Sequence, residues 1–323
     1  MYTYEDHMMH DAWYFVDDEN DAVHMFHLAE PLEGGPSFVG HAISRDLVTW
    51  ERLPTALRTG PPGSWDDLRI CTGSVIERDG QYWMAYSATS LNDSTHEEQH
   101  RVQRAGMAVS DDLITWAKLP ENPVTEAVAP HYERMGTGQR KMHHWRDPFL
   151  FEEGDAVYQL VCARRNEGPT GARGTVALAR SVDMQVWEVL PPLEHDRISD
   201  EMEVPQLYRI GECWYLVFCT LGRFLTPEHA ERFGGGLPER SNFSMVAGSP
   251  FGPFRVHGTG QIVEHDPDAV FYAAQLVEFN GSWYLLATIK DEQGERISDP
   301  VPVYADNTGI HAVTSSSDPP GPC

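Results

Sequence analysis

The chain has 323 residues and a formal net charge of −25, with a sequence pI of about 4.8. Such an acidic chain lacks the basic face that phosphate backbones require, which argues against nucleic acid as a partner. No apolar run approaches the length of a membrane span, which argues against a membrane partner. With 41% hydrophobic residues, the composition predicts a globular protein of one large domain or two ordinary ones.

The cysteines and the two ends of the sequence bear on location. The five cysteines include no C-x-x-C pair, so we expect reduced thiols rather than a disulfide framework. The first residues form neither a basic nor an apolar segment of the kind found in secretory signals. We therefore expect a cytoplasmic protein. Residues 314–323 are rich in Ser, Pro and Gly, and we expect them to form a disordered tail.

Taken in chain order, five segments have the pattern of β-hairpins. Aromatic and β-branched residues alternate with polar ones on both sides of short turns. The clearest turn is Asn280-Gly281, the strongest short-range hairpin signal. The paired strands are predicted at 12–16 with 22–28, 73–76 with 82–87, 149–151 with 157–162, 207–210 with 214–219, and 276–279 with 283–289.

A second motif repeats between these hairpins. Ser44–Trp50, Ser110–Trp116 and Ser181–Trp187 share a Ser-x-Asp sequence followed by an apolar residue and, at the end, Trp. A weaker copy covers 243–256. The motif predicts a strand, a turn closed by side-chain to backbone hydrogen bonds, and a further strand.

Together the repeats define five units that start near residues 11, 73, 147, 203 and 274. Four strands repeated five times predict an all-β fold, a five-bladed β-propeller with four antiparallel strands per blade. We expect residues 1–313 to form this single domain. The alternative is one or two β-sandwiches, which also contain many short strands. One short helix is predicted at 226–233, a segment that begins with an N-cap Thr and a Pro and is followed by three glycines.

The chemistry is expected at the starts of the innermost strands, because these converge on one mouth of a propeller. Asp11, Asp147 and Glu203 occupy three of the five starts. Three carboxylates in one mouth repel each other and displace each other's pKa. Two carboxyl groups that flank a glycosidic bond can hydrolyse it. The alternative is that each carboxylate caps a turn, which we favour for one position alone but not for three equivalent positions.

Several motifs resemble those of a known group of enzymes. They are 40–57 with 63–67 and 72–75, Trp145-Arg146-Asp147-Pro148, the Glu-x-Pro of 203–205, and His10-Asp11-Ala12-Trp13. The chain resembles the five-bladed propeller glycosidases of glycoside hydrolase families 32, 43 and 68, and most closely a family 32 β-fructosidase. The resemblance covers residues 5–313. It does not include the C-terminal β-sandwich domain that is usual in family 32.

The resemblance implies roles for individual residues. Asp11 would be the nucleophile, Glu203 the general acid/base, and Asp147 the stabiliser of the transition state, with Arg146 beside it. Glu201 competes with Glu203 for the acid/base role, and Pro205 favours Glu203. Weaker candidates for the sugar subsite are Trp13, Trp65, Ser74 and Gln275.

The implied activity is hydrolysis of a small furanoside, a fructoside or an arabinofuranoside, by a retaining route. No cofactor is expected. The alternatives are a glycosyl-transferring or tailoring enzyme on the same scaffold and a non-catalytic sugar-binding propeller. Product analysis with added acceptors would separate transfer from hydrolysis, and sugar binding without turnover would indicate a binding module.

Two further patterns are weighed against plainer explanations. His96-Glu97-Glu98-Gln99-His100 fits the H-E-x-x-H zinc motif but lies in a polar loop, so we expect no metal. We expect the His143-His144 pair to make rim or polar contacts.

A cluster of basic residues surrounds the third unit. Salt bridging is the favoured explanation for this cluster, and a pocket for an anionic substrate group is the alternative. The cluster comprises Arg140, Lys141, Arg146, Arg164, Arg165 and Arg173.

Overall fold

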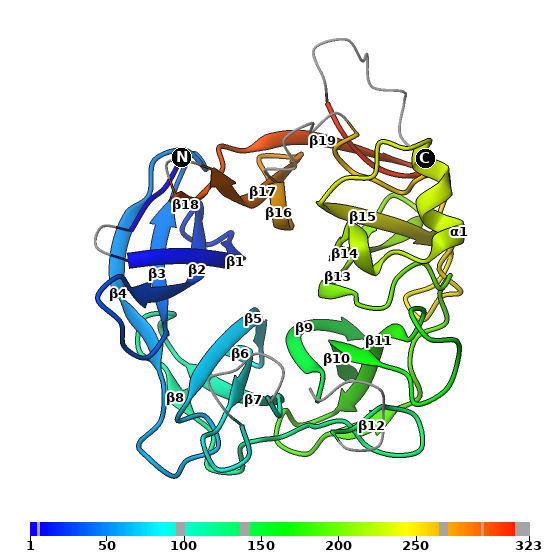
Figure 1. The fold of residues 1–323 in the computed structure, drawn as a ribbon. Helices are drawn as coiled ribbons and strands as arrows, with labels where there is room; N and C mark the ends of the chain where they lie inside the picture. The colour runs from blue at the N-terminus through cyan, green and yellow to red at the C-terminus, as the bar shows by residue number, and fades with distance from the viewer. Residues whose placement is uncertain (5–6, 95–100, 136–142, 265–270, 292–293, 314–323) are drawn as a thin grey trace.

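Five antiparallel sheets are arranged in a ring around a common centre, as Figure 1 shows. The computed structural model describes residues 1–4, 7–94, 101–135, 143–264, 271–291 and 294–313. This arrangement confirms the prediction of an all-β, five-bladed propeller. The predicted tail, 314–323, and the H-E-x-x-H segment lie outside the described residues.

Blades one to three each contain four strands in simple up-and-down order. Their strands are β1 (His7–Asp17), β2 (Ala22–Pro31), β3 (Phe38–Ser44) and β4 (Glu51–Arg58); β5 (Arg69–Arg78), β6 (Gln81–Thr89), β7 (Arg104–Ser110) and β8 (Ala117–Lys118); and β9 (Trp145–Glu153), β10 (Ala156–Arg164), β11 (Gly174–Ser181) and β12 (Glu188–Leu190). The innermost strands β1, β5 and β9 start close to the predicted positions.

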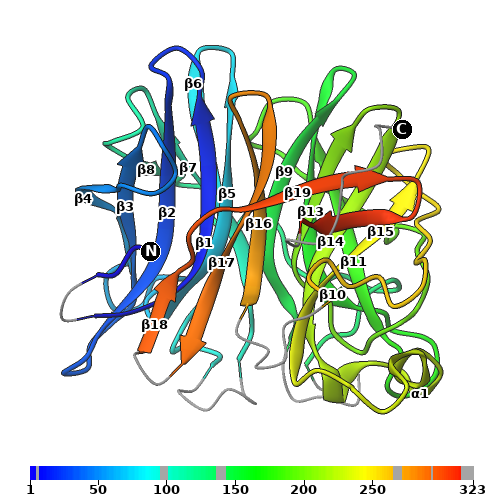
Figure 2. The ribbon, with the colours of Figure 1, turned by 90° about the horizontal axis from the view of Figure 1, so that it is seen from above.

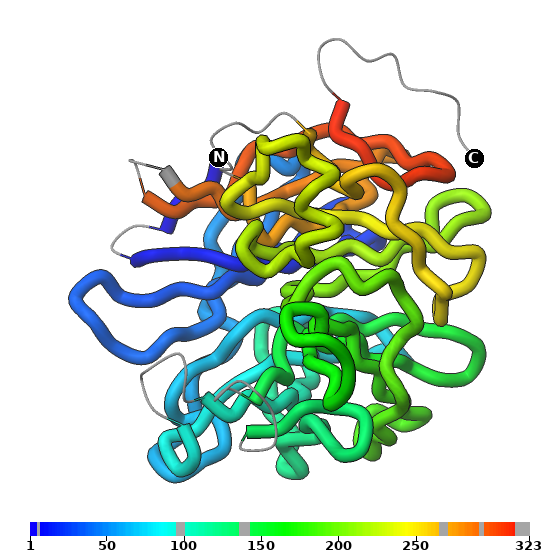
Figure 3. The backbone as a smooth tube through the Cα atoms, turned by 45° about the vertical axis from the view of Figure 1, so that its right-hand side comes forward, coloured from blue at the N-terminus to red at the C-terminus, as the bar shows by residue number. Residues whose placement is uncertain are grey.

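Blades four and five depart from this regular order at their outer edges. Their strands are β13 (Glu203–Ile210), β14 (Cys213–Leu221) and β15 (Arg240–Ala247); and β16 (Phe271–Phe279), β17 (Ser282–Asp291), β19 (Val301–Asp306) and β20 (Gly309–Ala312), with β18 (Gly294–Ile297) paired to β17. Two isolated bridges pair β15 with the segment that follows it, Phe243 with Gln261 and Val246 with Arg255. Figure 3 shows the red C-terminal strands beside the yellow segment after β15, where the Ala312 amide donates to the Ile262 carbonyl at 2.8 Å.

The repeated Ser-x-Asp motif forms the same turn in blades one, two and three. In blade two, Asp112 Oδ1 accepts the amides of Ile114 and Thr115 at 2.8 and 2.7 Å, and Ser110 Oγ donates to it at 3.0 Å. Trp116 Nε1 then donates to the Leu113 carbonyl at 2.9 Å. Because the next strand follows directly, each motif links the third strand of its blade to the fourth.

The predicted helix is present and short. Thr226 is the N-cap of α1 (Pro227–Ala230) and accepts the His229 amide, as predicted. A 3-10 turn, Glu231–Phe233, follows and ends at Gly234, whose φ of +57° suits a residue without a side chain. The helix lies at the end of the ring where the innermost strands begin (Figure 2).

The apolar core is divided into clusters between neighbouring blades. One joins Trp13 and Phe26 of blade one to Val75 and Met84 of blade two. Blades one and five share another, and their contact is extended by backbone hydrogen bonds between Tyr2 and Ile297 at 3.1 and 3.0 Å. The ring is therefore held together by packing between sheets rather than by one central core.

The cysteines and the helices bear on two expectations from the sequence, reduced thiols and the absence of a membrane span. In the described ranges, Cys71, Cys162, Cys213 and Cys219 form no disulfide bond. None of the helices in those ranges is long and apolar enough to cross a membrane.

Candidate active site

The innermost strand of every blade is out of register near its start. The shifts lie between His10 and Ala12, Ile70 and Gly73, Leu160 and Cys162 on the strand facing β9, Glu203 and Gln206, and Tyr272 and Gln275. Four of these bulges contain a non-glycine residue with positive φ: Asp11 at 45°, Asp147 at 59°, Val204 at 49° and Ala273 at 47°. Bulges redirect side chains and are common beside active sites.

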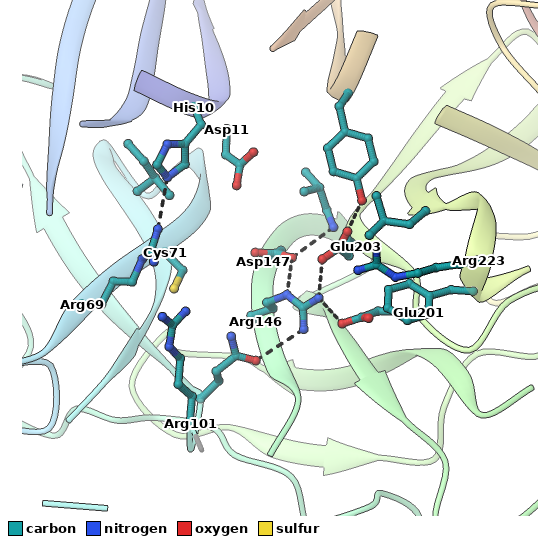
Figure 4. A pocket seen from close by; sticks show the side chains of 16 residues that line it. His10, Asp11, Arg69, Cys71, Arg101, Arg146, Asp147, Glu201, Glu203 and Arg223 are labelled. Atoms are coloured by element: carbon teal, nitrogen blue, oxygen red, sulfur yellow. Dashed lines mark hydrogen bonds and ion pairs between the residues drawn. The ribbon is translucent and has the colours of Figure 1, made fainter. Parts of the chain in front are cut away.

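The bulges surround a cavity of about 390 Å³ at the start of the strands. Asp11, Asp147 and Glu203 all line it, together with Arg146 and Glu201. The structure thus brings together the three predicted carboxylates from blades one, three and four. Figure 4 shows the Asp11 side chain directed into the pocket, facing Asp147 and Glu203.

The Arg146 side chain contacts several of the acidic groups in this pocket. Its Nη2 contacts Glu201 Oε1 and lies 2.6 Å from Glu203 Oε1, and its Nε lies 3.4 Å from Asp147 Oδ2. Its Nη1 lies 3.0 Å from His144 Nδ1. One buried guanidinium therefore serves three carboxylates.

Glu203 is buried strongly enough to outweigh two contacts, from Arg146 and Tyr272, that favour its ionised form. Tyr272 donates a hydrogen bond to Oε2 from the inner strand of blade five. Burial raises the pKa of Glu203 to about 7, with Glu201 and Asp147 adding to the rise and Arg146 opposing it. A carboxyl group that stays protonated near neutrality can act as a general acid.

Glu201, two residues away, has the opposite character. Burial alone would raise its pKa, but Arg146 and His144 hold the pKa of Glu201 well below its usual value. Its Oε1 lies 3.2 Å from His144 Nδ1. Neighbouring carboxyl groups are thus driven to different protonation states.

Asp147 and Asp11 are fixed through backbone and hydroxyl contacts. Asp147 accepts a hydrogen bond from the Thr72 hydroxyl and one from the Val204 amide at 3.2 Å. Burial raises the pKa of Asp147, while Arg146 and Thr72 oppose the rise. The Asp11 amide donates to Thr288 Oγ1 at 2.9 Å, which anchors the bulge of β1 to blade five.

The four weaker candidates from the sequence do not line this pocket. Trp13 is fully buried between blades one and two, and Trp65 packs on Tyr86 with ring centroids 5.4 Å apart. Ser74 and Gln275 line a separate cavity of about 250 Å³. Trp13, Ser74 and Gln275 lie on strands, where successive side chains alternate in direction, whereas Trp65 lies in the turn region between β4 and β5.

Several pocket residues escaped the sequence reasoning. Tyr272 precedes the expected start of unit five by two residues, so its place in the repeat was the one available signal. His10 lies next to Asp11 but carries no motif of its own. The remaining charged ones are Arg69, Arg101 and Arg223.

The basic cluster predicted around unit three is mostly structural. Arg164 is buried, with Nη1 2.7 Å from Asp200 Oδ1, and Arg173 lies 3.3 Å from Glu133. Arg165 donates to the Leu193 carbonyl. Only Arg146 of this cluster lines the pocket among the described residues, and 140 and 141 lie outside them. Salt bridging, the favoured explanation, therefore accounts for Arg164 and Arg173.

The His143-His144 pair predicted from the sequence lies in the interior near the pocket. His143 and His144 are both buried, and His144 forms the polar contacts with Arg146 and Glu201 given above. No group of three or more His, Cys, Asp or Glu side chains in the described ranges is arranged to hold a metal ion.

Known proteins provide an independent comparison. The family model described as "Glycosyl hydrolases family 32 N-terminal domain" matches residues 5–297. A sucrose-6-phosphate hydrolase of Escherichia coli is 25% identical over 79% of this chain and 49% of its own length, and one of Zymomonas mobilis is 30% identical over 62% and 38%. The chain thus spans about half or less of these relatives. The structure of the Bombyx mori GH32 beta-fructofuranosidase BmSUC1 has a TM-score of 0.70 at 19% identity, covering 96% of this chain and 65% of that one.

Proposed function

The chain belongs to glycosyl hydrolase family 32, and from that premise we propose that it hydrolyses the glycosidic bond of a small fructofuranoside such as sucrose. The observation that carries the proposal is the pocket in which Asp11, Asp147 and Glu203 meet around the Arg146 guanidinium. The names of the relatives, sucrose-6-phosphate hydrolases and a beta-fructofuranosidase, support a fructoside over an arabinofuranoside.

The proposed route has two displacements and retains the configuration. Asp11 attacks the anomeric carbon while Glu203 gives its proton to the departing oxygen, which leaves a covalent fructosyl ester on Asp11. Water then attacks the same carbon, Glu203 takes the proton from that water, and the ester bond to Asp11 breaks. Asp147 accepts hydrogen bonds from sugar hydroxyls as positive charge develops on the ring.

The nucleophile assignment is tested by Asp11→Asn, which removes the charge and keeps the size. Because no covalent intermediate can form, kcat for glucose release from sucrose should fall by at least about 1,000-fold. Asp17→Asn, at the other end of β1, is the matched control and should retain turnover. Undiminished turnover in Asp11→Asn would remove the assignment. Sugar binding without turnover in the unmutated protein would instead favour a binding module.

Transfer to a sugar acceptor is the second candidate and uses the same first displacement. The acceptor hydroxyl would replace water in the second step. The ratio of released fructose to released glucose distinguishes the two reactions, since hydrolysis gives equal amounts and transfer gives less free fructose. We propose hydrolysis as the main reaction.

An anionic group on the leaving sugar is a narrower part of the proposal. Arg69 and Arg101 line the candidate pocket and also an adjoining cavity of about 550 Å³. In Figure 4 they lie across the pocket from Glu203 and Arg223, and we propose that an anionic group of the substrate reaches this side. Guanidinium groups bind phosphate and carboxylate strongly, and the names of two relatives specify a phosphorylated sucrose.

Arg101→Gln tests this part of the proposal. We expect kcat/KM for sucrose 6-phosphate to fall about tenfold or more and that for sucrose to change little, because only the first substrate loses a charged hydrogen bond. Arg165→Gln, whose side chain contacts the Leu193 carbonyl away from the pocket, is the control. Equal losses on both substrates in Arg101→Gln would contradict an anion subsite.

A further inference from the structure

Glu201 is buried deeply and its backbone is fixed. It is 5% exposed, its amide donates to Ser199 Oγ at 3.2 Å, and Ser199 Oγ donates to its carbonyl at 2.7 Å. Its carboxylate contacts Arg146 and His144. A charged group in this position is stable only through such partners, so the contact with Arg146 is not readily given up.

The Arg146 guanidinium is shared between Glu201 and Glu203 and is held in place by further contacts. Its Nη2 contacts both carboxylates, its Nε lies near Asp147, and its Nη1 lies near His144 and 3.5 Å from Gln103 Oε1. The positive charge is thus divided among three acidic groups. Glu203 receives only part of the stabilisation that a guanidinium would give to a single ionised partner.

We propose that Glu201 is a positioning residue for the proton-transfer step. Because Glu201 also binds the Arg146 guanidinium, ionised Glu203 is stabilised less, and Glu203 keeps its proton until the leaving oxygen takes it. The inference rests on the proposed function for its meaning in catalysis. Glu201 itself contacts no reacting atom in this scheme and acts only through Arg146 and Glu203.

Arg223 of the 3-10 turn Gly222–Phe224 lies on the same side of the pocket as Glu203 (Figure 4), and the other groups facing Glu203 come from four neighbouring strands. They are Arg146 and Asp147 of β9, Tyr272 of β16, Cys219 of β14, whose Sγ lies 3.6 Å from the Glu203 carbonyl, and Asp11 of β1 across the pocket. Burial raises the pKa of Cys219 well above its usual value, so this thiol is neutral and adds no charge. Asp147 adds to the rise in the Glu203 pKa, but it forms a separate contact with Arg146 through Nε. Glu201 is the acidic group that shares the same guanidinium nitrogen with Glu203.

Glu201→Gln is the central experiment, because it removes the charge at almost constant volume. With Glu201 neutral, Arg146 stabilises ionised Glu203 more fully and one negative neighbour is lost. Both effects lower the Glu203 pKa. The basic limb of kcat/KM for sucrose should move about one unit to lower pH, so that activity above the limb falls roughly tenfold. Activity on the acidic side should stay within about threefold of the unmutated enzyme.

Two variants separate this effect from a general structural role. Glu201→Asp keeps the charge and should return the basic limb toward its original pH. Glu133→Gln removes another buried carboxylate paired with arginines, Arg164 and Arg173, away from the pocket, and should leave the limb in place. A basic limb that stays unchanged in Glu201→Gln, or that moves equally in Glu133→Gln, would overturn the proposal.

A carbon-13 titration of the glutamate carboxyl groups provides a readout that needs no turnover. Glu203 is assigned by the signal lost in Glu203→Gln. We expect its titration near neutrality in the unmutated protein and at lower pH in Glu201→Gln. If no fructoside is hydrolysed, the proposed function fails while this measurement still tests the coupling. Should Glu201→Gln not fold, the unmutated protein decides: Glu201 titrating at or above the pH of Glu203 overturns the inference, and the reverse order supports it.

Discussion

Glu201 and Glu203 show how far the surroundings of a side chain determine its chemistry. They are the same residue type, two positions apart, and both line the pocket. The side chain of Glu201 is 7% exposed and contacts Arg146 and His144, whereas that of Glu203 is 23% exposed and opens toward the cavity. Their pKa values are displaced in opposite directions, which is the arrangement expected when one carboxyl group donates a proton and another holds charge.

Glu203→Gln tests the acid role through the leaving group. With sucrose, whose leaving oxygen needs a proton, kcat/KM should fall by about 100-fold to 10,000-fold. With an aryl fructoside whose phenolate leaves without a proton, the loss should be much smaller. The unmutated enzyme should lose activity as pH rises through about 7, where Glu203 gives up its proton, and the variant should lack this limb. A leaving-group dependence seen in Glu201→Gln instead would reverse the assignment.

At the scale of elements, the bulges of the innermost strands do the positioning. A regular strand would send alternate side chains to opposite faces of its sheet. The positive φ at Asp11 and Asp147 breaks this alternation where a carboxylate is needed at the mouth. Val204, a β-branched residue at φ 49°, adopts a conformation that such residues rarely take, and its amide binds Asp147. None of the four bulge residues with positive φ, Asp11, Asp147, Val204 and Ala273, is a glycine, so the bulges could not be predicted from the sequence.

The Ser-x-Asp turns make a separate prediction about stability. Asp112→Ala removes an acceptor for two backbone amides and should lower the midpoint of thermal unfolding by about 2 °C, while Asp112→Asn, which keeps an acceptor oxygen, should lower it less. These hydrogen bonds lower the pKa of Asp112 in the folded chain. The carboxylate therefore stabilises the fold above its ordinary pKa, and this contribution is lost as pH falls through the lowered value. Calorimetry at pH 7 and pH 3 should show the difference between Asp112→Ala and the unmutated protein shrinking with acid.

For the whole molecule, the repeats were enough to predict the ring. Each Ser-x-Asp turn is closed by local hydrogen bonds, and each hairpin turn depends on residues such as Asn280-Gly281, so short segments specify the blades. The convergence of Asp11, Asp147 and Glu203 followed from equivalent positions in those blades.

The rest of the pocket could not be predicted because it depends on contacts between distant segments. Arg69 is the first residue of β5 and Arg101 precedes β7, whereas Trp13 packs against the neighbouring blade two. Local sequence patterns do not specify which blade a side chain will face. A cytoplasmic location stays a prediction.

The packing of Trp13 has a consequence for how activity responds to changes far from the pocket. Asp11, Asp147 and Glu203 belong to three different sheets, so the spacing between Asp11 and Glu203 depends on how closely neighbouring blades pack. Trp13 and Phe26 stack on each other and pack between blades one and two. Changes to this packing would therefore alter the spacing between Asp11 of blade one and the carboxylates of blades three and four, although Trp13 itself does not line the pocket.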